Sequence, residues 1–181
     1  TMNLFDNLEN INKQMPLANI LRPKTLDEYL GQTNVISDNS PIYNLLKAKR
    51  IFSFILWGPP GCGKTTLARL IANYHNANFI ELSAVTSGVK DVKEAVENAK
   101  ENLRNGIKTI LFIDEIHRYS KTQQDALLPH IEDGTLHLIG STTENPSFQV
   151  IPALLSRVQI IMLNAIDNES MRKIISKGFN Y

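Results

Sequence analysis

The stretch WGPPGCGKTT at 57–66 holds the strongest chemical signal in the sequence. Gly58 is separated by four residues from Gly63, Lys64 and Thr65, which gives the pattern G-x-x-x-x-G-K-[ST]. Glycines let backbone N–H groups converge on a phosphate without a Cβ in the way, and a helix starting there adds its own free N–H groups. The lysine supplies positive charge, and the threonine hydroxyl can ligate Mg²⁺. The spacing therefore predicts a nucleotide-binding loop.

Every residue of this loop is a candidate phosphate contact. Prolines at two positions stiffen the turn because their rings fix φ. The simpler alternative is a Gly/Pro-rich turn with a surface lysine, but the loop follows an apolar run and precedes a helical pattern, as a phosphate site requires. The predicted contacts are Gly58, Pro59, Pro60, Gly61, Cys62, Gly63, Lys64, Thr65 and Thr66.

A second site is predicted where TILFIDEIHR leaves a buried strand. Asp114 and Glu115 come at the carboxyl end of that strand, the edge where open α/β sheets bind ligands. An acid there can hold the Mg²⁺ that Thr65 also approaches, and its neighbour can polarise a water for attack on the γ-phosphate. Two solvated acids at a strand end are the alternative. The pair beside a phosphate loop favours hydrolysis over binding alone.

Strand and helix patterns alternate along the chain, which positions these residues at one sheet edge. Parallel strands need helical crossovers, so the alternation predicts an α/β fold with a parallel sheet covered on both faces. The expected strands are 51–57, 77–83, 108–114, 135–141 and 158–163. The expected helices are 40–50, 64–75, 89–105, 120–133, 152–157 and 168–179.

Composition bounds the alternatives. The chain has 181 residues, 43% hydrophobic and 20% charged, with a net charge of +1. The balance gives no general attraction to nucleic acid or membrane, and no apolar run approaches a membrane span of about 20 residues. One cysteine excludes an internal disulfide, and the four histidines lack metal-ligand spacing. We expect a cytoplasmic protein without a membrane partner.

Three segments together carry a family resemblance. GPPGCGKTTLARLIA, LFIDEIHR and IGSTTENPSFQV followed by ALLSR resemble the AAA+ ATPases of the clamp-loader clade. The longer segment KTQQDALLPHIEDGTLHLIGSTTENPSF is similar to the replication-associated recombination protein A family, the MgsA or Werner-interacting-protein-like ATPases. The resemblance covers residues 16–165 and rests on the combination of motifs.

The resemblance implies a P-loop NTPase fold with a five-stranded parallel sheet in the order 5-1-4-3-2. It divides the chain into an N-terminal segment (1–24) that contributes to an adenine pocket, a nucleotide-binding domain (25–165) and the start of a truncated helical lid (166–181). The stretches ILRP and YLGQ match those that enclose adenine. The implied adenine-pocket residues are Leu21, Arg22, Pro23, Leu30 and Gly31.

The resemblance also assigns roles to matching positions. Asp114 becomes the metal-binding acid with Thr65, and Glu115 the base. LHLIGSTT matches a strand whose polar residue reads the γ-phosphate; Thr143 is the first choice, with Thr142 and Asn145 as alternatives. Arg157 in LLSR matches an arginine finger that reaches the ATP of a neighbouring subunit. The implied catalytic residues are Lys64, Glu115, Thr143 and Arg157.

The implied activity is Mg²⁺-dependent ATP hydrolysis in a homo-oligomer that binds ATP and ADP. The implied targets are DNA forks, ends or single-strand/duplex junctions at stalled replication, and replication proteins such as single-strand binding protein. A clamp-loader subunit, a Holliday-junction branch-migration motor and a non-catalytic ATP-binding subunit remain alternatives. Because a lid arginine of the family lies outside the chain, we expect the chain alone to hydrolyse ATP weakly.

Overall fold

The computed structural model describes residues 22–25, 28–29, 37, 40–47 and 50–179. Five parallel strands form one sheet in the order β2-β3-β4-β1-β5, which confirms the expected order. The strands are β1 (Phe54–Trp57), β2 (Asn78–Ser83), β3 (Thr109–Asp114), β4 (His137–Thr142) and β5 (Gln159–Met162).

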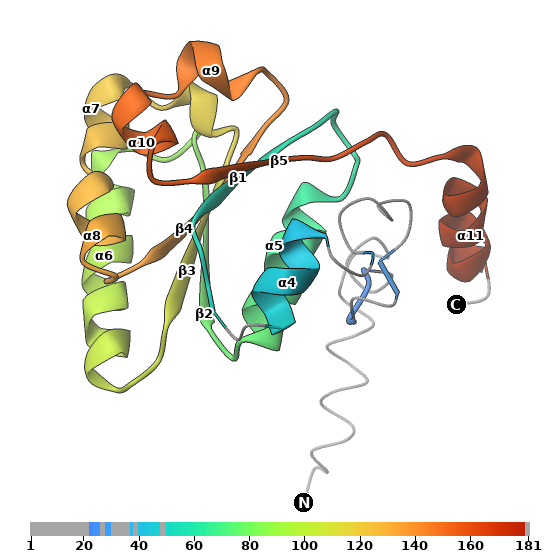
Figure 1. Cartoon of the computed structure of the whole chain (residues 1–181), viewed down its shortest axis with the longest axis horizontal. Coiled ribbons are helices and arrows are strands. Elements are labelled where there is room, and N and C mark those ends of the chain that lie inside the picture. The colour runs from blue at the N-terminus through green and yellow to red at the C-terminus, as the bar shows by residue number, and fades with distance from the viewer. Residues whose placement is uncertain (1–21, 26–27, 30–36, 38–39, 48–49, 180–181) are drawn as a thin grey trace, which may run out of the picture.

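Helices cover both faces of the sheet, as predicted. Figure 1 shows α4 and α5 on one side of it and α6, α7 and α8 on the other. The helices are α4 (Pro41–Lys47), α5 (Lys64–Tyr74), α6 (Val89–Arg104), the 3₁₀ turn η1 (Ile116–Arg118), α7 (Lys121–Asp125), α8 (Leu128–Glu132), α9 (Pro146–Gln149), α10 (Pro152–Leu155) and α11 (Asn168–Phe179).

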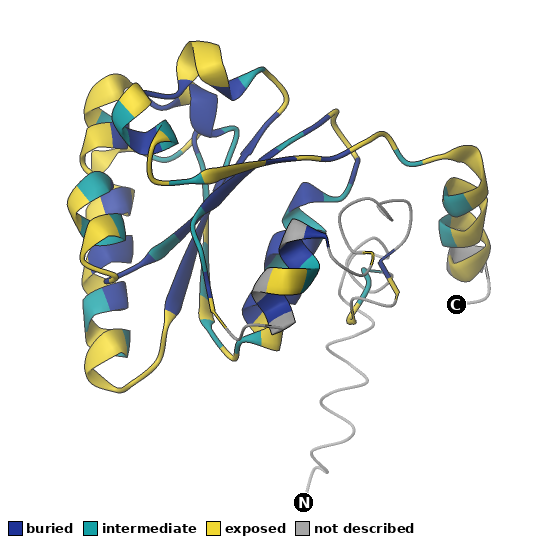
Figure 2. Ribbon diagram, in the orientation of Figure 1, coloured by how far each residue is buried: buried dark blue, intermediate teal, exposed yellow. Residues whose placement is uncertain are grey.

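The central strands feed two separate hydrophobic cores because successive side chains of a strand point to opposite faces. On β1, Phe54 and Leu56 join the core beneath α4 and α5, while Ile55 joins the core beneath α6. On β3, Phe112 and Ile113 divide in the same way. Figure 2 shows buried central strands and partly exposed edge strands. The sheet is therefore packed on both faces.

The predicted single helix over 120–133 is wrong, since the structure has two short helices there. Ser120 and Gln123 do form the expected capping box, with each backbone N–H bonded to the other residue's side chain. The helix then breaks at residues 126–127, before α8. Pro129 has no N–H to offer the carbonyl one helical turn earlier, so the α-helical ladder cannot run through it.

The first strand also begins later than predicted, at residue 54 instead of 51. Ser53 takes part through its side chain, whose Oγ accepts the Leu138 N–H at 2.9 Å. The other predicted strands and helices lie within a few residues of the observed ones, apart from α9, which was not predicted.

Helix α11 lies apart from the sheet, at the end of an extended segment (Figure 1). Its Lys177 Nζ lies 3.6 Å from Glu28 Oε2, an exposed ion pair. The division of the chain at 24 and 165 remains a prediction, and residues 1–21 lie outside the described part. Among the described residues, no helix has the length and apolar character needed to span a bilayer.

Candidate nucleotide-binding and hydrolysis site

The glycine-rich loop runs from the end of β1 into α5, and its lysine is folded back against it. Lys64 is buried, and its Nζ donates to the carbonyl oxygens of Gly58 at 2.7 Å and Pro59 at 2.8 Å. Gly63 caps α5 with φ of 95°, a left-handed conformation that favours glycine. The loop thus surrounds an ammonium group at the amino end of an eleven-residue helix. This arrangement suits an anion, because the charge and the free helix N–H groups act together.

Position 58 has no room for a side chain, so it requires glycine. A Cβ there would lie 2.6 Å from the Leu163 carbonyl oxygen and 3.1 Å from Cys62 Sγ. The crowded carbonyl belongs to a backbone that cannot easily yield, since Leu163 N donates to Trp57 O at 2.8 Å. The loop therefore approaches the end of β5 more closely than any side chain at position 58 would allow.

We predict that Gly58→Ala destabilises the fold by about 1–3 kcal/mol, the usual cost of overpacking, and weakens ATP binding. Thermal unfolding and calorimetric titration with ATP measure the two effects. Gly106→Ala is the matched control: its φ is 73° with nothing within 4 Å of a new Cβ, so about 1–2 kcal/mol of backbone strain should come without any loss of affinity. Wild-type stability and affinity in Gly58→Ala would contradict the steric argument.

Tyr29 supports the loop from outside it, a role that was not predicted from the sequence. Its hydroxyl donates to Gly63 O at 3.1 Å and approaches Cys62 O at 3.4 Å. Burial raises the pKa of Tyr29, so the hydroxyl keeps its proton. The only local signal was its position within YLGQ, which the resemblance linked to adenine.

The acidic pair lies at the carboxyl end of β3, where the next strand contributes a partner. Ser141 Oγ donates to Asp114 Oδ1 and accepts the Glu115 N–H at 3.2 Å. Ser141 is fully buried and was not predicted. The strand register explains the contact, because Gly140 pairs with Ile113 and the next residues therefore lie side by side. Ser141 thus fixes the carboxylate of Asp114 and the backbone of Glu115.

Glu115 adopts a left-handed backbone with φ of 53°, a conformation that costs a non-glycine residue about 1–3 kcal/mol and often marks functional sites. Its Oε2 accepts from Thr143 N at 3.4 Å and Thr143 Oγ1 at 3.3 Å. The same oxygen lies 3.0 Å from His117 Nδ1. The turn therefore directs the carboxylate toward the end of β4.

The three sensor candidates differ in what their side chains do. The Thr142 hydroxyl is buried and bonded to both the N–H and the carbonyl of Glu144 at 3.0 Å. Asn145 Oδ1 accepts the Ser147 N–H and caps α9. Only the exposed Thr143 reaches the Glu115 carboxylate. Of the three candidates, Thr143 is therefore the one that contacts the Glu115 carboxylate, and its role as the sensor remains a prediction.

The phosphate loop and the acidic cluster meet at the same edge of the sheet. Strand β4 lies between β1 and β3, and the Gly58 N–H donates to the Thr142 carbonyl at 3.1 Å. Arg157 lies elsewhere: within the described residues it bonds to Glu132, Ala153 and Ser156, and to no residue of the phosphate loop. The cluster within one chain therefore lacks this arginine.

The part of the chain that carries this geometry is similar to a known protein family. The protein-family model "ATPase family associated with various cellular activities (AAA)" matches residues 54–165, more than half of the chain. The chain belongs to the AAA family of ATPases. Its match begins at β1 and ends just after β5, so it contains the whole sheet and every residue of the phosphate loop.

The AAA chain has close relatives among curated proteins. It is 49% identical over 167 residues to the replication-associated recombination protein A of Escherichia coli, covering 92% of the chain and 37% of that protein. It is 47% identical over 177 residues to the ATPase WRNIP1 of Dictyostelium discoideum, covering 97% of the chain and 20% of that protein. The chain therefore spans well under half of the length of these relatives.

Solved structures agree with the fold. The Thermotoga maritima RuvB Holliday junction branch migration motor superposes with a TM-score of 0.68 and 31% identity, over 87% of the AAA chain and 53% of RuvB. RuvB is an AAA+ P-loop NTPase, and the sheet of this chain is five-stranded and parallel with the order β2-β3-β4-β1-β5. The expected fold class is thus confirmed.

The oxygen donors of the AAA chain fit Mg²⁺, which prefers carboxylate, hydroxyl and phosphate oxygens. Asp114 is half-buried and held by Ser141, and Thr65 opens α5. Among the described residues no three His, Cys, Asp or Glu side chains gather as a metal site. Two protein donors completed by phosphate and water oxygens are the usual set for this ion.

Other predicted site residues of the AAA chain are only partly described. Arg22 and Pro23 are half-buried, whereas Leu21, Leu30 and Gly31 lie outside the described residues. Cys62 is buried, and burial raises the pKa of its thiol although the nearby Lys64 opposes this. The thiol is therefore not activated as a nucleophile.

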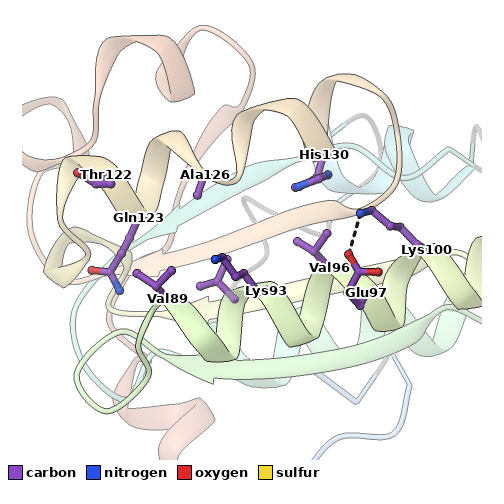
Figure 3. Close-up of a pocket in the computed structure, with 10 residues that line it drawn as sticks. Val89, Lys93, Val96, Glu97, Lys100, Thr122, Gln123, Ala126 and His130 are labelled. Atoms are coloured by element: carbon purple, nitrogen blue, oxygen red, sulfur yellow. Dashed lines mark hydrogen bonds and ion pairs between the residues drawn. The ribbon is translucent and has the colours of Figure 1, made fainter.

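A groove of about 420 Å³ lies between α6 and the helices α7 and α8 of the AAA chain (Figure 3). Val89, Val96 and Ala126 give it apolar walls, and Lys93 and His130 add polar groups. None of its lining residues belongs to the phosphate loop or the acidic pair. It is therefore separate from the nucleotide site.

Proposed function

We propose that the chain is the ATP-binding and ATP-hydrolysing part of an oligomeric protein that acts on DNA in replication-associated recombination. The observation that carries this proposal is the convergence of Lys64, Asp114 and Glu115 at one sheet edge, joined through the Gly58–Thr142 backbone bond. A phosphate loop alone would support binding; a carboxylate aimed at the same edge supports hydrolysis.

Each proposed catalytic residue has a separate task. Lys64 exchanges the loop carbonyls for the β- and γ-phosphate oxygens. Glu115 takes a proton from water as the water oxygen bonds to the γ-phosphorus and the bond to the ADP oxygen breaks. Thr143 holds Glu115. When bound by Thr65 and Asp114, Mg²⁺ would offset the negative charge of the phosphates.

Arg157 is proposed to act on the ATP of a neighbouring subunit. Its side chain is 38% exposed and paired with Glu132 on α8, away from the phosphate loop of its own chain. An exposed arginine fixed at the end of a short helix is available to a second copy. This supports a homo-oligomer in which each site is completed by the next subunit.

The DNA role is proposed from the names of the relatives. The Escherichia coli relative is a replication-associated recombination protein, so we propose that the intact protein works on DNA at stalled forks, ends or single-strand/duplex junctions. A net charge of +1 provides no general attraction to DNA. DNA and replication proteins, single-strand binding protein among them, would then contact local patches or parts of the protein beyond this chain.

A branch-migration motor is the second candidate, favoured by the 31% identity to RuvB. The ATPase rate of the intact protein with forked, four-way-junction, duplex and single-stranded DNA separates the candidates. Stimulation by forks and single-strand/duplex junctions supports the first, and selective stimulation by four-way junctions supports the second. No ATP turnover with any DNA, despite ATP binding, would leave only a non-catalytic assembly subunit.

We predict that Lys64→Ala weakens ATP binding about 10- to 100-fold, since hydrogen bonds from a charged group contribute about 1.5–3 kcal/mol each. Calorimetric titration of the intact protein with ATP and Mg²⁺ measures the affinity. Lys90→Ala, on the exposed side of α6, is the control that should bind like wild type. Unchanged affinity in Lys64→Ala would overturn the assignment of the loop.

A further inference from the structure

His117 is buried directly behind the acidic pair and has no role in the reaction proposed above. Its side chain is 5% exposed, against 26% for that of Glu115. It sits in η1, which follows at once on the left-handed turn at Glu115. That turn brings both side chains to the same side of the chain, facing the loop that follows β4.

The partners of Nδ1 show which ring nitrogen carries the hydrogen. Nδ1 lies 3.0 Å from Glu115 Oε2 and 2.9 Å from Thr142 Oγ1. A carboxylate oxygen only accepts, and the Thr142 hydroxyl already donates its hydrogen to Glu144 O. Both neighbours of Nδ1 are therefore acceptors, so Nδ1 must donate.

The other edge of the ring faces Glu144. Nε2 lies 3.5 Å from Glu144 Oε1, whose side chain is 53% exposed. Thr142 fixes the backbone of Glu144 through two hydrogen bonds of 3.0 Å. The imidazole thus lies between η1 and the loop after β4, and it cannot turn without losing the contacts of Nδ1.

The two carboxylate oxygens of Glu115 differ in their hydrogen-bond contacts. Oε2 accepts from His117 and Thr143, whereas no described residue hydrogen-bonds to Oε1. A carboxylate anchored through one oxygen has the other available for the proton of a water. Fixed orientation of this kind contributes strongly to rate, and small misplacements of a reacting group cost up to about 100-fold.

We propose that His117 is a positioning residue: its Nδ1–H holds Oε2 of Glu115 so that Oε1 faces the attacking water. The proposal rests on the proposed role of Glu115 as the base. It assigns His117 no contact with ATP, so loss of the imidazole should slow turnover without weakening nucleotide binding.

Two amide replacements separate positioning from packing. Asparagine can place its Nδ2–H near the position of the histidine Nδ1–H, whereas the longer glutamine places its amide nearer to Nε2. In the intact protein we expect His117→Ala and His117→Gln to lower kcat about 10- to 100-fold, with KM for ATP and calorimetric affinity within about twofold of wild type. His117→Asn should recover kcat to within about threefold of wild type.

The outcomes are distinguishable. His130→Asn on α8, outside the site, is the control and should keep the wild-type kcat. Thermal unfolding of each variant checks folding; if His117→Ala unfolds, the comparison of Asn with Gln decides. Equal kcat in those two variants, unchanged kcat in all, or faster turnover without the imidazole would overturn the proposal. If Glu115→Gln keeps full turnover, the proposed function fails first.

Discussion

Glu115→Gln is expected to lower turnover severely while ATP still binds. Glutamine has nearly the same size and can keep the contact with Thr143 by an amide flip, but it cannot take a proton from water. General bases contribute about 10²- to 10⁴-fold to rate, so kcat should fall by that factor while the dissociation constant for ATP stays within about twofold. Steady-state hydrolysis and calorimetric titration of the intact protein measure the two quantities.

Glu97→Gln is the matched control for this substitution. Its carboxylate is exposed on α6 and pairs with Lys100 at 2.8 Å, far from the phosphate loop in the chain and outside the acidic cluster. Such exposed pairs contribute little, so turnover and stability should barely change. Retained turnover in Glu115→Gln would show that another group accepts the proton, and the hydrolytic mechanism proposed above would be wrong.

Arg157→Ala should reduce kcat by about 10³- to 10⁵-fold, the contribution of an arginine finger where one operates. ATP affinity should hardly change, because among the described residues the Arg157 side chain bonds to α8, α10 and the residue after α10 and to none of the phosphate loop. The Arg157→Ala variant is also expected to fold, since the ion pair that it loses with Glu132 is exposed and contributes little stability. The hydrolysis rate and the ATP dissociation constant of the intact protein are the measurements.

A mixing experiment tests whether Arg157 acts on a neighbour. Lys64→Ala and Arg157→Ala are each expected to be inactive alone, but mixed oligomers contain interfaces that join an intact loop to an intact arginine. Partial recovery of turnover on mixing is the expected result. Arg104→Ala on α6 should be active alone. Failure of mixed, assembled oligomers to recover turnover would contradict the arrangement in trans.

Local sequence patterns predict many of the strands, helices and candidate site residues of this protein. The phosphate loop is one contiguous run whose glycines, lysine and threonine must lie together because the chain joins them. Asp114 and Glu115 lie at the carboxyl end of a strand whose continuous apolar residues predict that it is buried. The alternation of strands and helices predicts a parallel sheet. The order of the strands came from resemblance, because periodicity within a strand carries no information about its neighbours.

The tertiary structure decided which distant residues meet. Ser141 reaches Asp114 because β4 lies beside β3, and Tyr29 reaches Gly63 across more than thirty residues of sequence. His117 faces Glu115 because of one left-handed turn. The helix breaks before α8 because of Pro129, although the apolar pattern of 120–133 predicted one continuous helix. Sequence spacing determined the groups that can act on phosphate, since their chemistry is local. Only strand register and backbone turns determined which side chains hold those groups, since such contacts depend on parts of the chain that fold together.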